Sequence, residues 1–309
     1  MKIACFDEDR IGVVRDDAIV DLTEITSQAN DGVGAMVSVI ANFADLRGDI
    51  ERYVSQAEGL PLSSVTLQAP IPRPGKIIAM GSNYLEGTAG PPLPIWAFFK
   101  SPEAILGPGG TVILPDADAR VFHHEPELVA IVGKTTKNAS KDNALDSIFG
   151  YTGGIDVSGR FDIFAQSILN KSHDTFAPIG PWIVTADEIP NPQSLQIQLQ
   201  VDGQARHDFN TSDMGHNISD CIEYVSSITT LNPGDLIFTG TNHQGIGPIQ
   251  DGEQVEVTVE KIGKLKVQVS DHLKRTWNKG VDKEMGQRII RMINDREPPG
   301  GIRPQVTQS

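Results

Sequence analysis

Alternation of apolar and polar side chains is the feature of this sequence that most restricts its fold. From residue 195 to residue 202, apolar residues at the odd positions alternate with glutamines and an aspartate at the even ones. A period of two puts successive side chains on opposite faces of a strand, so this stretch is predicted to be a strand with one buried face. The other strand-like runs lie at 76–80, 127–132, 181–185, 234–240 and 253–269. The chain is therefore expected to be β-rich.

Helical periodicity, with apolar residues three and four positions apart, is confined to 140–149, 218–228 and 285–293. Before residue 70, short strand-like runs are separated by acidic turns, and the prolines of "APIPRPGK" (69–76) then break the pattern. We predict an α+β, β-rich fold with a small N-terminal β-rich domain at 1–70. A main domain follows at 71–270, and a C-terminal helix with a flexible tail at 271–309.

Charge and composition favour a small-molecule partner. The chain has 26 basic and 40 acidic residues, a net charge of −14, which argues against nucleic acid and anionic membranes as partners. The start "MKIACFDEDR" lacks the apolar stretch of a signal peptide, and no apolar run is long enough to span a membrane. Cys5 and Cys221 are the only cysteines, and neither lies in a reactive motif. These observations predict a cytoplasmic protein.

The stretch "VFHHEPELVAIVGK" (121–134) places two glutamates at the start of an apolar strand. In a strand, Glu125 and Glu127 point to the same face, about 7 Å apart at Cα. Two carboxylates on a half-buried face repel each other unless a cation, such as a hard divalent metal ion, lies between them. Alternatively, both lie beyond the buried part of the strand and are solvated. The pair alone leaves both interpretations open.

Three further segments carry polar residues beside glycines or turns. Asp156 follows two glycines in "GYTGGIDVSGR" (150–160), Lys171 precedes a loop that enters a strand, and "FTGTNHQGIGP" (238–248) ends a strand in glycines and hydroxyls. Each has an ordinary structural explanation as a turn aspartate, a surface lysine or a hairpin turn. Each is equally compatible with a binding site, including an anion-binding nest of backbone N–H groups in the last case.

Taken together and in this order, the motifs resemble the fumarylacetoacetate hydrolase family. The resemblance covers residues 76–270 and is carried by "KIIAMGSNY" (76–84), "FFKSPEAILGPGGTVILP" (98–115), "HEPELVAIVGK" (124–134), "GYTGGIDVSGR" (150–160), "KSHDTFAPIGPWIVTADEIP" (171–190), "NTSDM" (210–214) and "LNPGDLIFTGT" (231–241). It implies the mixed β-sandwich roll of that family for the main domain, and a homodimer.

The resemblance also implies roles for individual residues. It implies Glu125, Glu127 and Asp156 as ligands of Mg²⁺, or of Mn²⁺ or Ca²⁺, and Lys171 as a catalytic residue. The residues implied to bind substrate are Ser82, Tyr84, Arg160 and Thr241. A metal ion held by three carboxylates keeps open positions at which a 2-oxo acid can chelate, which stabilises an enolate.

One departure from the family concerns the base that activates water. Hydrolytic relatives usually follow the Asn-Tyr pair with a His-x-x-Glu dyad, but this chain has Gly87 and Gly90 there. The segment 85–94 is therefore expected to be a mobile or differently shaped lid that carries no catalytic group. His123, His173 and His243 are the alternative sources of a base, and strand parity favours His123, two residues before Glu125.

The predicted function is divalent-metal-dependent cleavage of a carbon–carbon bond next to a ketone in a 2-oxo acid or β-diketone, of the acylpyruvate or fumarylacetoacetate type. The alternatives within the family are a 2-oxo acid decarboxylase and a hydratase or isomerase, because a fold does not fix a reaction. A third alternative is a metal-binding homologue without catalysis, which the missing dyad favours.

Overall fold

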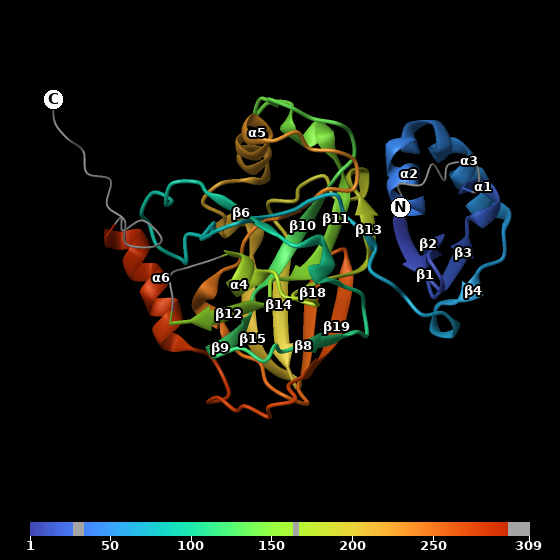
Figure 1. The fold of residues 1–309 in the computed structure, drawn as a ribbon. Coiled ribbons are helices and arrows are strands. Elements are labelled where there is room, and N and C mark those ends of the chain that lie inside the picture. Colours follow the sequence, from blue (N-terminus) through green and yellow to red (C-terminus); the bar gives the residue numbers. More distant parts are fainter. Residues whose placement is uncertain (27–33, 163–166, 296–309) are drawn as a thin grey trace.

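The computed structural model describes residues 1–26, 34–162 and 167–295, and its fold is strand-rich with few helices, as predicted (Figure 1). The tail that we predicted to be flexible lies outside the described residues from position 296 onward. None of the described helices is both long and apolar enough to cross a membrane.

The N-terminal segment begins with an antiparallel meander. Strands β1 (Lys2–Phe6), β2 (Arg10–Arg15) and β3 (Ala18–Asp21) pair in order, and β4 (Leu60–Pro61) pairs with β3. Between β3 and β4 the described helices are α1 (Thr23–Thr26), α2 (Ala35–Ala41) and α3 (Phe43–Gln56). Helical periodicity was expected in only three segments, none of them here, so that prediction is wrong.

The largest sheet combines the N-terminal strands with strands of the main domain. Its remaining strands are β5 (Ile77–Met80), β6 (Ala97–Lys100), β10 (Pro126–Val132), β11 (Ile148–Ile155), β13 (Ala177–Thr185) and β16 (Leu236–Phe238), in the order β4-β3-β2-β1-β13-β11-β10-β16-β5-β6. Strand β7 (Ile105–Leu106) pairs in parallel with β13. Because β1 pairs with β13, the N-terminal meander extends the sheet of the main domain, and it projects to one side of that domain in Figure 1.

A second sheet packs against the first to form a sandwich. Its strands are β15 (Gln204–Asn210), β14 (Gln196–Val201), β18 (Gln254–Val259), β19 (Gly263–Ser270) and β8 (Thr111–Ile113), in that order. The strand predicted from the alternation at 195–202 is confirmed as β14, with Ile197, Leu199 and Val201 buried. A small third sheet consists of β12 (Ser158–Phe161), β9 (Ala119–His124) and β17 (Gly247–Pro248).

The remaining described helices are few. They are α4 (Ser167–Lys171), α5 (Ile218–Ile228) and α6 (Lys283–Asp295), with 3₁₀ turns η2 (Leu62–Ser64), η3 (Pro102–Ala104), η4 (Ala144–Ser147), η5 (Ala186–Glu188), η6 (Thr211–Asp213) and η7 (His243–Gly245). The predicted helices at 218–228 and 285–293 are confirmed, the first with a capping box between Asn217 and Asp220. The helix expected at 140–149 is wrong, because η4 is a single turn that leads into β11.

Two strand junctions of this fold lie side by side. Glu125 stands where β9 passes into β10, and Asp156 stands where β11 passes into β12. Antiparallel pairing of β10 with β11 sets Glu127 opposite Gly154, and the backbone N–H of Asp156 donates to the carbonyl oxygen of Glu125 at 2.8 Å. A side chain at Gly154 would place Cβ only 2.6 Å from Val129 Cγ2, so the close packing of these strands requires glycine.

Candidate active site

Three carboxylates converge at the two junctions. Oxygen atoms of Glu125, Glu127 and Asp156 lie within 4.8 Å of one another, and these residues are only 5%, 1% and 1% exposed. The alternative that the two glutamates are solvated is therefore wrong. Strand parity predicted the shared direction of the glutamates, and the turn after β11 brings the aspartate to the same place.

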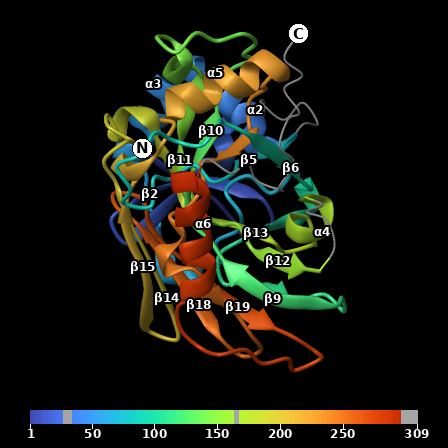
Figure 2. The same cartoon turned by 90° about the vertical axis from the view of Figure 1, so that its left-hand side faces the viewer.

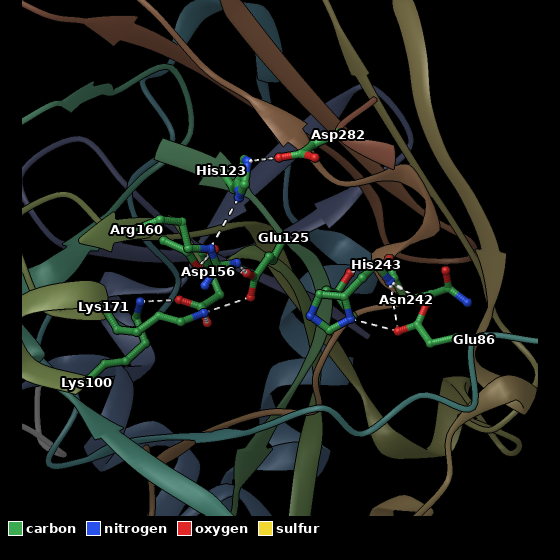
Figure 3. A network of polar contacts seen from close by, with 12 residues as sticks. Glu86, Lys100, His123, Glu125, Asp156, Arg160, Lys171, Asn242, His243 and Asp282 are labelled. Carbon is green, nitrogen blue, oxygen red and sulfur yellow. Dashed lines mark hydrogen bonds and ion pairs between the residues drawn. The ribbon is translucent and has the colours of Figure 1, made fainter. Parts of the chain in front are cut away.

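Three cations surround the carboxylates (Figure 3). Lys171 Nζ donates to Glu125 Oε2 at 2.8 Å and to Asp156 Oδ2 at 2.5 Å. Arg160 Nη2 donates to Glu125 Oε1 at 2.5 Å, and the buried Lys100 bonds to Asp156. Lys100 was missed in the sequence analysis, although it ends the apolar strand of the "FFK" motif. Its place at the end of the apolar run 97–99 is the sequence signal that could have identified it.

The neighbouring cations affect the pKa values of the two glutamates differently. Burial alone raises the pKa of Glu125, but the charges of Lys171 and Arg160 outweigh it and hold that pKa well below its usual value. Among the described residues no cation forms an ion pair with Glu127, and burial, with Asp156 and Glu125 nearby, outweighs the charge of Lys171 and raises the pKa of Glu127 well above its usual value. The ionised form of Glu127 therefore requires a further positive charge nearby. A divalent cation bound at the triad would supply that charge.

Neighbouring groups fix the orientation of the carboxylates. The backbone N–H of Gly240, just after β16, donates to Glu127 Oε2 at 2.5 Å. The hydroxyl of Ser158 donates to Glu125 Oε1 at 2.9 Å. These contacts aim the oxygens without adding charge, so the arrangement suits a hard metal ion that takes oxygen ligands.

The cavity beside the triad has a volume of about 120 Å³ and includes most of the predicted substrate-binding residues. Ser82, Arg160 and Thr241 line it together with Lys171. Tyr84 does not line it, because its ring is packed in the hydrophobic core against Phe209. Tyr84 therefore does not border the cavity, and its role in substrate binding stays a prediction.

His123, the favoured base, is buried behind Arg160 and does not line the cavity. Its Nδ1 accepts from Arg160 Nε at 3.3 Å, and its Nε2 lies 3.2 Å from Asp282 Oδ2. Burial and, after it, the positive charge of Arg160 lower the pKa of His123 to about 3, although the charges of Asp282 and Glu125 oppose this shift. Both nitrogens of His123 therefore face protein groups, and its role as the base stays a prediction.

His173 also lies away from the cavity, with its ring against Phe161 and Phe176. His243 does line the cavity, and it contacts a residue that the sequence analysis overlooked. The Nδ1 atom of His243 lies 2.7 Å from Oε1 of the buried Glu86, and the backbone N–H of His243 donates to both oxygens of that carboxylate. Figure 3 shows the imidazole between Glu86 and the acidic triad.

The segment 85–94 was expected to carry no catalytic group, yet its buried Glu86 contacts His243, which lines the cavity. The segment is also tied to its surroundings. The N–H of Leu85 donates to the carbonyl of Asp213, and Leu93 packs against Ile289 and Ile293 of α6. These contacts hold the segment near both of its ends.

The fold and the site together define a metal-dependent enzyme whose carboxylate centre lies inside a β-sandwich. A family model described as "Fumarylacetoacetate (FAA) hydrolase C-terminal" matches residues 76–270. The chain belongs to this family, as the sequence motifs predicted, and the predicted class of a metal-dependent carbon–carbon bond hydrolase is confirmed with it.

Several relatives have a described activity. Maleylpyruvate hydrolase of Aquipseudomonas alcaligenes is 34% identical over 288 residues, which cover 87% of this chain and 99% of the relative. A 2,4-didehydro-3-deoxy-L-rhamnonate hydrolase of Sphingomonas sp. is 37% identical over 65% of this chain and 75% of that protein. Among solved structures, maleylpyruvate hydrolase from Sphingobium sp. SYK-6, in complex with manganese(II) and pyruvate, has a TM-score of 0.79 and 37% identity. That alignment covers 88% of this chain and 99% of the solved one.

We predict that Glu127→Gln and Asp156→Asn each weaken Mn²⁺ binding by at least about 100-fold, because removing a ligand costs more than the 10- to 100-fold loss typical of a residue that only supports one. Isothermal titration calorimetry measures the affinity directly. Glu256→Gln is the matched control, since Glu256 is a buried carboxylate of β18 that pairs with Lys264 and Lys266, away from the triad. Unchanged Mn²⁺ affinity in both triad variants would show that the triad is not the metal site.

Proposed function

We propose that this chain hydrolyses the carbon–carbon bond next to a ketone in an acylpyruvate-type substrate, with Glu125, Glu127 and Asp156 as ligands of one divalent cation. The observation that carries the proposal is the buried triad, in which Lys171 bridges two members. The similarity to maleylpyruvate hydrolases over most of both chains supports it. Buried oxygen ligands suit Mg²⁺ and Mn²⁺, with Ca²⁺ as a further possibility, and we propose Mg²⁺ as the resident ion and the cytoplasm as its location.

The reaction adds water across the bond between the acyl carbonyl carbon and the adjacent methylene carbon. The oxygen of water bonds to the acyl carbon, and a base accepts the proton that this oxygen loses. The electron pair of the broken carbon–carbon bond leaves as the enolate of pyruvate, which then takes up a proton. The products are a carboxylic acid and pyruvate. A divalent cation at the triad supplies Lewis-acid stabilisation of negative charge on the substrate oxygens.

The cations of the site suit the pyruvoyl half of such a substrate. Lys171 and Arg160 line the cavity, and both are held at its charged side by Glu125. We assign Lys171 as the donor to the oxygen on which enolate charge develops, and Arg160 to the carboxylate of the substrate. Burial lowers the pKa of Lys171, but the attraction of Asp156 and Glu125 more than compensates and raises it, so the ammonium stays charged.

We assign the proton from water to His243, with Glu86 as its partner. Because an ionised carboxylate only accepts hydrogen bonds, Nδ1 of His243 carries the proton of the 2.7 Å contact. Nε2 is then left with its lone pair, on the side of the ring that faces the triad in Figure 3. This pair performs the task of the family dyad with residues 157 positions apart in the chain.

Replacement of Lys171 by methionine is expected to lower kcat by about 10²- to 10³-fold, the usual effect of removing one donor to a developing oxyanion. Mn²⁺ affinity should not fall, because the variant loses a positive charge beside the metal ligands. Steady-state kinetics with acetylpyruvate and calorimetry with Mn²⁺ give the two values. Lys141→Met, at an exposed surface lysine, is the control. Equal kcat in Lys171→Met and wild type would refute the role.

His243→Asn and Glu86→Gln should each reduce acetylpyruvate hydrolysis by about 10²- to 10⁴-fold, the range attributed to general-base catalysis. Both variants should still bind Mn²⁺ and then oxalate, a mimic of the pyruvate enolate, because neither residue holds the charged side of the cavity. His272→Asn, at an exposed histidine, controls for loss of an imidazole. If His123→Asn abolished hydrolysis and His243→Asn did not, the base would be His123, as strand parity first suggested.

A homodimer is also proposed, and the edge of the largest sheet supports it. Strand β6 ends that sheet, and its Phe99 is 54% exposed. Ile168 on α4, which packs beside β6, is 74% exposed. An unpaired edge strand with adjoining apolar side chains is a ready surface for a second copy.

We expect the wild type to sediment as a dimer at micromolar concentration, and Phe99→Asp combined with Ile168→Asp to sediment as a monomer. Leu145→Asp, at an exposed leucine elsewhere, should leave the dimer intact. A wild type that is monomeric at this concentration would exclude the proposed assembly.

A further inference from the structure

Helix α6 lies outside the part of the chain that matches the family, yet it reaches the cavity. The family match ends at residue 270, and α6 begins at Lys283. Its residues Met285 and Ile289 line the same cavity as the carboxylates. In Figure 2, α6 runs in front of the sheets, close to the strands that carry the site.

Several contacts fix the position of α6. Asp282, just before the helix, accepts from the backbone N–H of Met285 at 3.0 Å and lies 3.2 Å from Nε2 of His123. At Gly286 an added Cβ would lie 3.1 Å from the carbonyl oxygen of His243, so the helix backbone approaches η7 closely. Farther along, Ile289 and Ile293 pack with Leu93 in a small apolar cluster. These contacts hold the helix against the main domain, where it forms one wall of the cavity.

The cavity has a charged side and an apolar side. The charged side consists of the triad with Arg160 and Lys171. The hydrophobic residues that line the cavity are Met80, Trp96, Phe98, Met285 and Ile289. Trp96 can lie flat against the chain because residue 81 is glycine, where a Cβ would overlap the indole at 1.9 Å. With a volume of about 120 Å³, the cavity leaves little space beyond the pyruvoyl group, so the apolar side chains limit what else can enter.

We propose that α6 selects the acyl group of the substrate. This inference rests on the proposed function: if the pyruvoyl half lies at the charges, the acyl half meets Met285 and Ile289. The substrate class is then an acylpyruvate whose acyl group presents hydrocarbon to α6. An apolar wall discriminates between ligands by size. The helix therefore determines how long the hydrocarbon of the acyl group can be.

The test measures kcat/KM for hexanoylpyruvate relative to acetylpyruvate. Met285→Ala and Ile289→Ala enlarge the cavity and are expected to raise this ratio by about tenfold, the lower end of the effect of methylene groups in an apolar pocket. Met285→Phe fills the cavity and should lower the ratio by a similar factor. The enlarging and filling variants act in opposite directions, so the prediction stands on whichever of them folds.

Met292→Ala is the matched control, because Met292 is on the same helix and packs against the Leu93 cluster without lining the cavity. Its ratio should equal that of the wild type, whereas a role of α6 in stability alone would make Met292→Ala and Met285→Ala behave alike. Equal ratios in the wild type, Met285→Ala, Ile289→Ala and Met285→Phe, with oxalate inhibition intact, would overturn the inference about α6. A wild type that hydrolyses no acylpyruvate and binds no oxalate in the presence of Mn²⁺ would instead overturn the proposed function.

Discussion

Burial of three carboxylates in one place is the constraint on which the rest of the site depends. At a separation of 4.8 Å, each pair of like charges repels by roughly 3.5 kcal/mol at an effective dielectric constant of about 20. If all three carboxylates were ionised, three such pairs together would be comparable with the whole stability of a typical domain, about 5–15 kcal/mol, and the raised pKa of Glu127 reflects this repulsion. Lys100, Arg160 and Lys171 offset this repulsion in the structure. The fold can keep the triad only by surrounding it with cations, and those cations are what a substrate with carboxylate and ketone oxygens needs.

The strands of the sandwich position the three carboxylates, and the loops between elements carry the other polar groups of the site. Glu127 belongs to a central strand, and its neighbours Glu125 and Asp156 sit at strand junctions whose backbones are bonded to each other. Glu86 and His243 come from connections that meet at the rim of the cavity. Helix α6 then closes the apolar side. The charged half of the cavity thus lies within the family domain, and part of the apolar half comes from outside it.

Local patterns in the sequence were sufficient to predict many of the strands and the position of the two glutamates. Period-two alternation located the strand at 196–201, and strand parity placed Glu125 and Glu127 on one face. Contacts between distant segments carry no such periodic signal. Glu86 was overlooked because its contact with His243 joins residues 157 positions apart. Tyr84 was placed among the substrate-binding residues although its ring packs in the core, because a motif position does not reveal where a ring packs. Helix α3 was missed although its apolar residues recur at helical spacing, since the strand-like runs at the start of the chain led us to interpret all of 1–70 as β-rich.

Comparison of His123 and His243 shows why proximity in sequence is a poor guide to a base. A general base needs one nitrogen with a free lone pair facing the water and the other nitrogen held by an acceptor. His123, two residues from Glu125, receives a hydrogen bond from a guanidinium on one nitrogen and faces Asp282 with the other, so neither nitrogen is available. His243 is 118 positions farther along the chain than Glu125, yet Glu86 holds its Nδ1 and its ring borders the cavity. The identity of the partners, and not the distance to the metal ligands along the chain, therefore decides which imidazole can activate water.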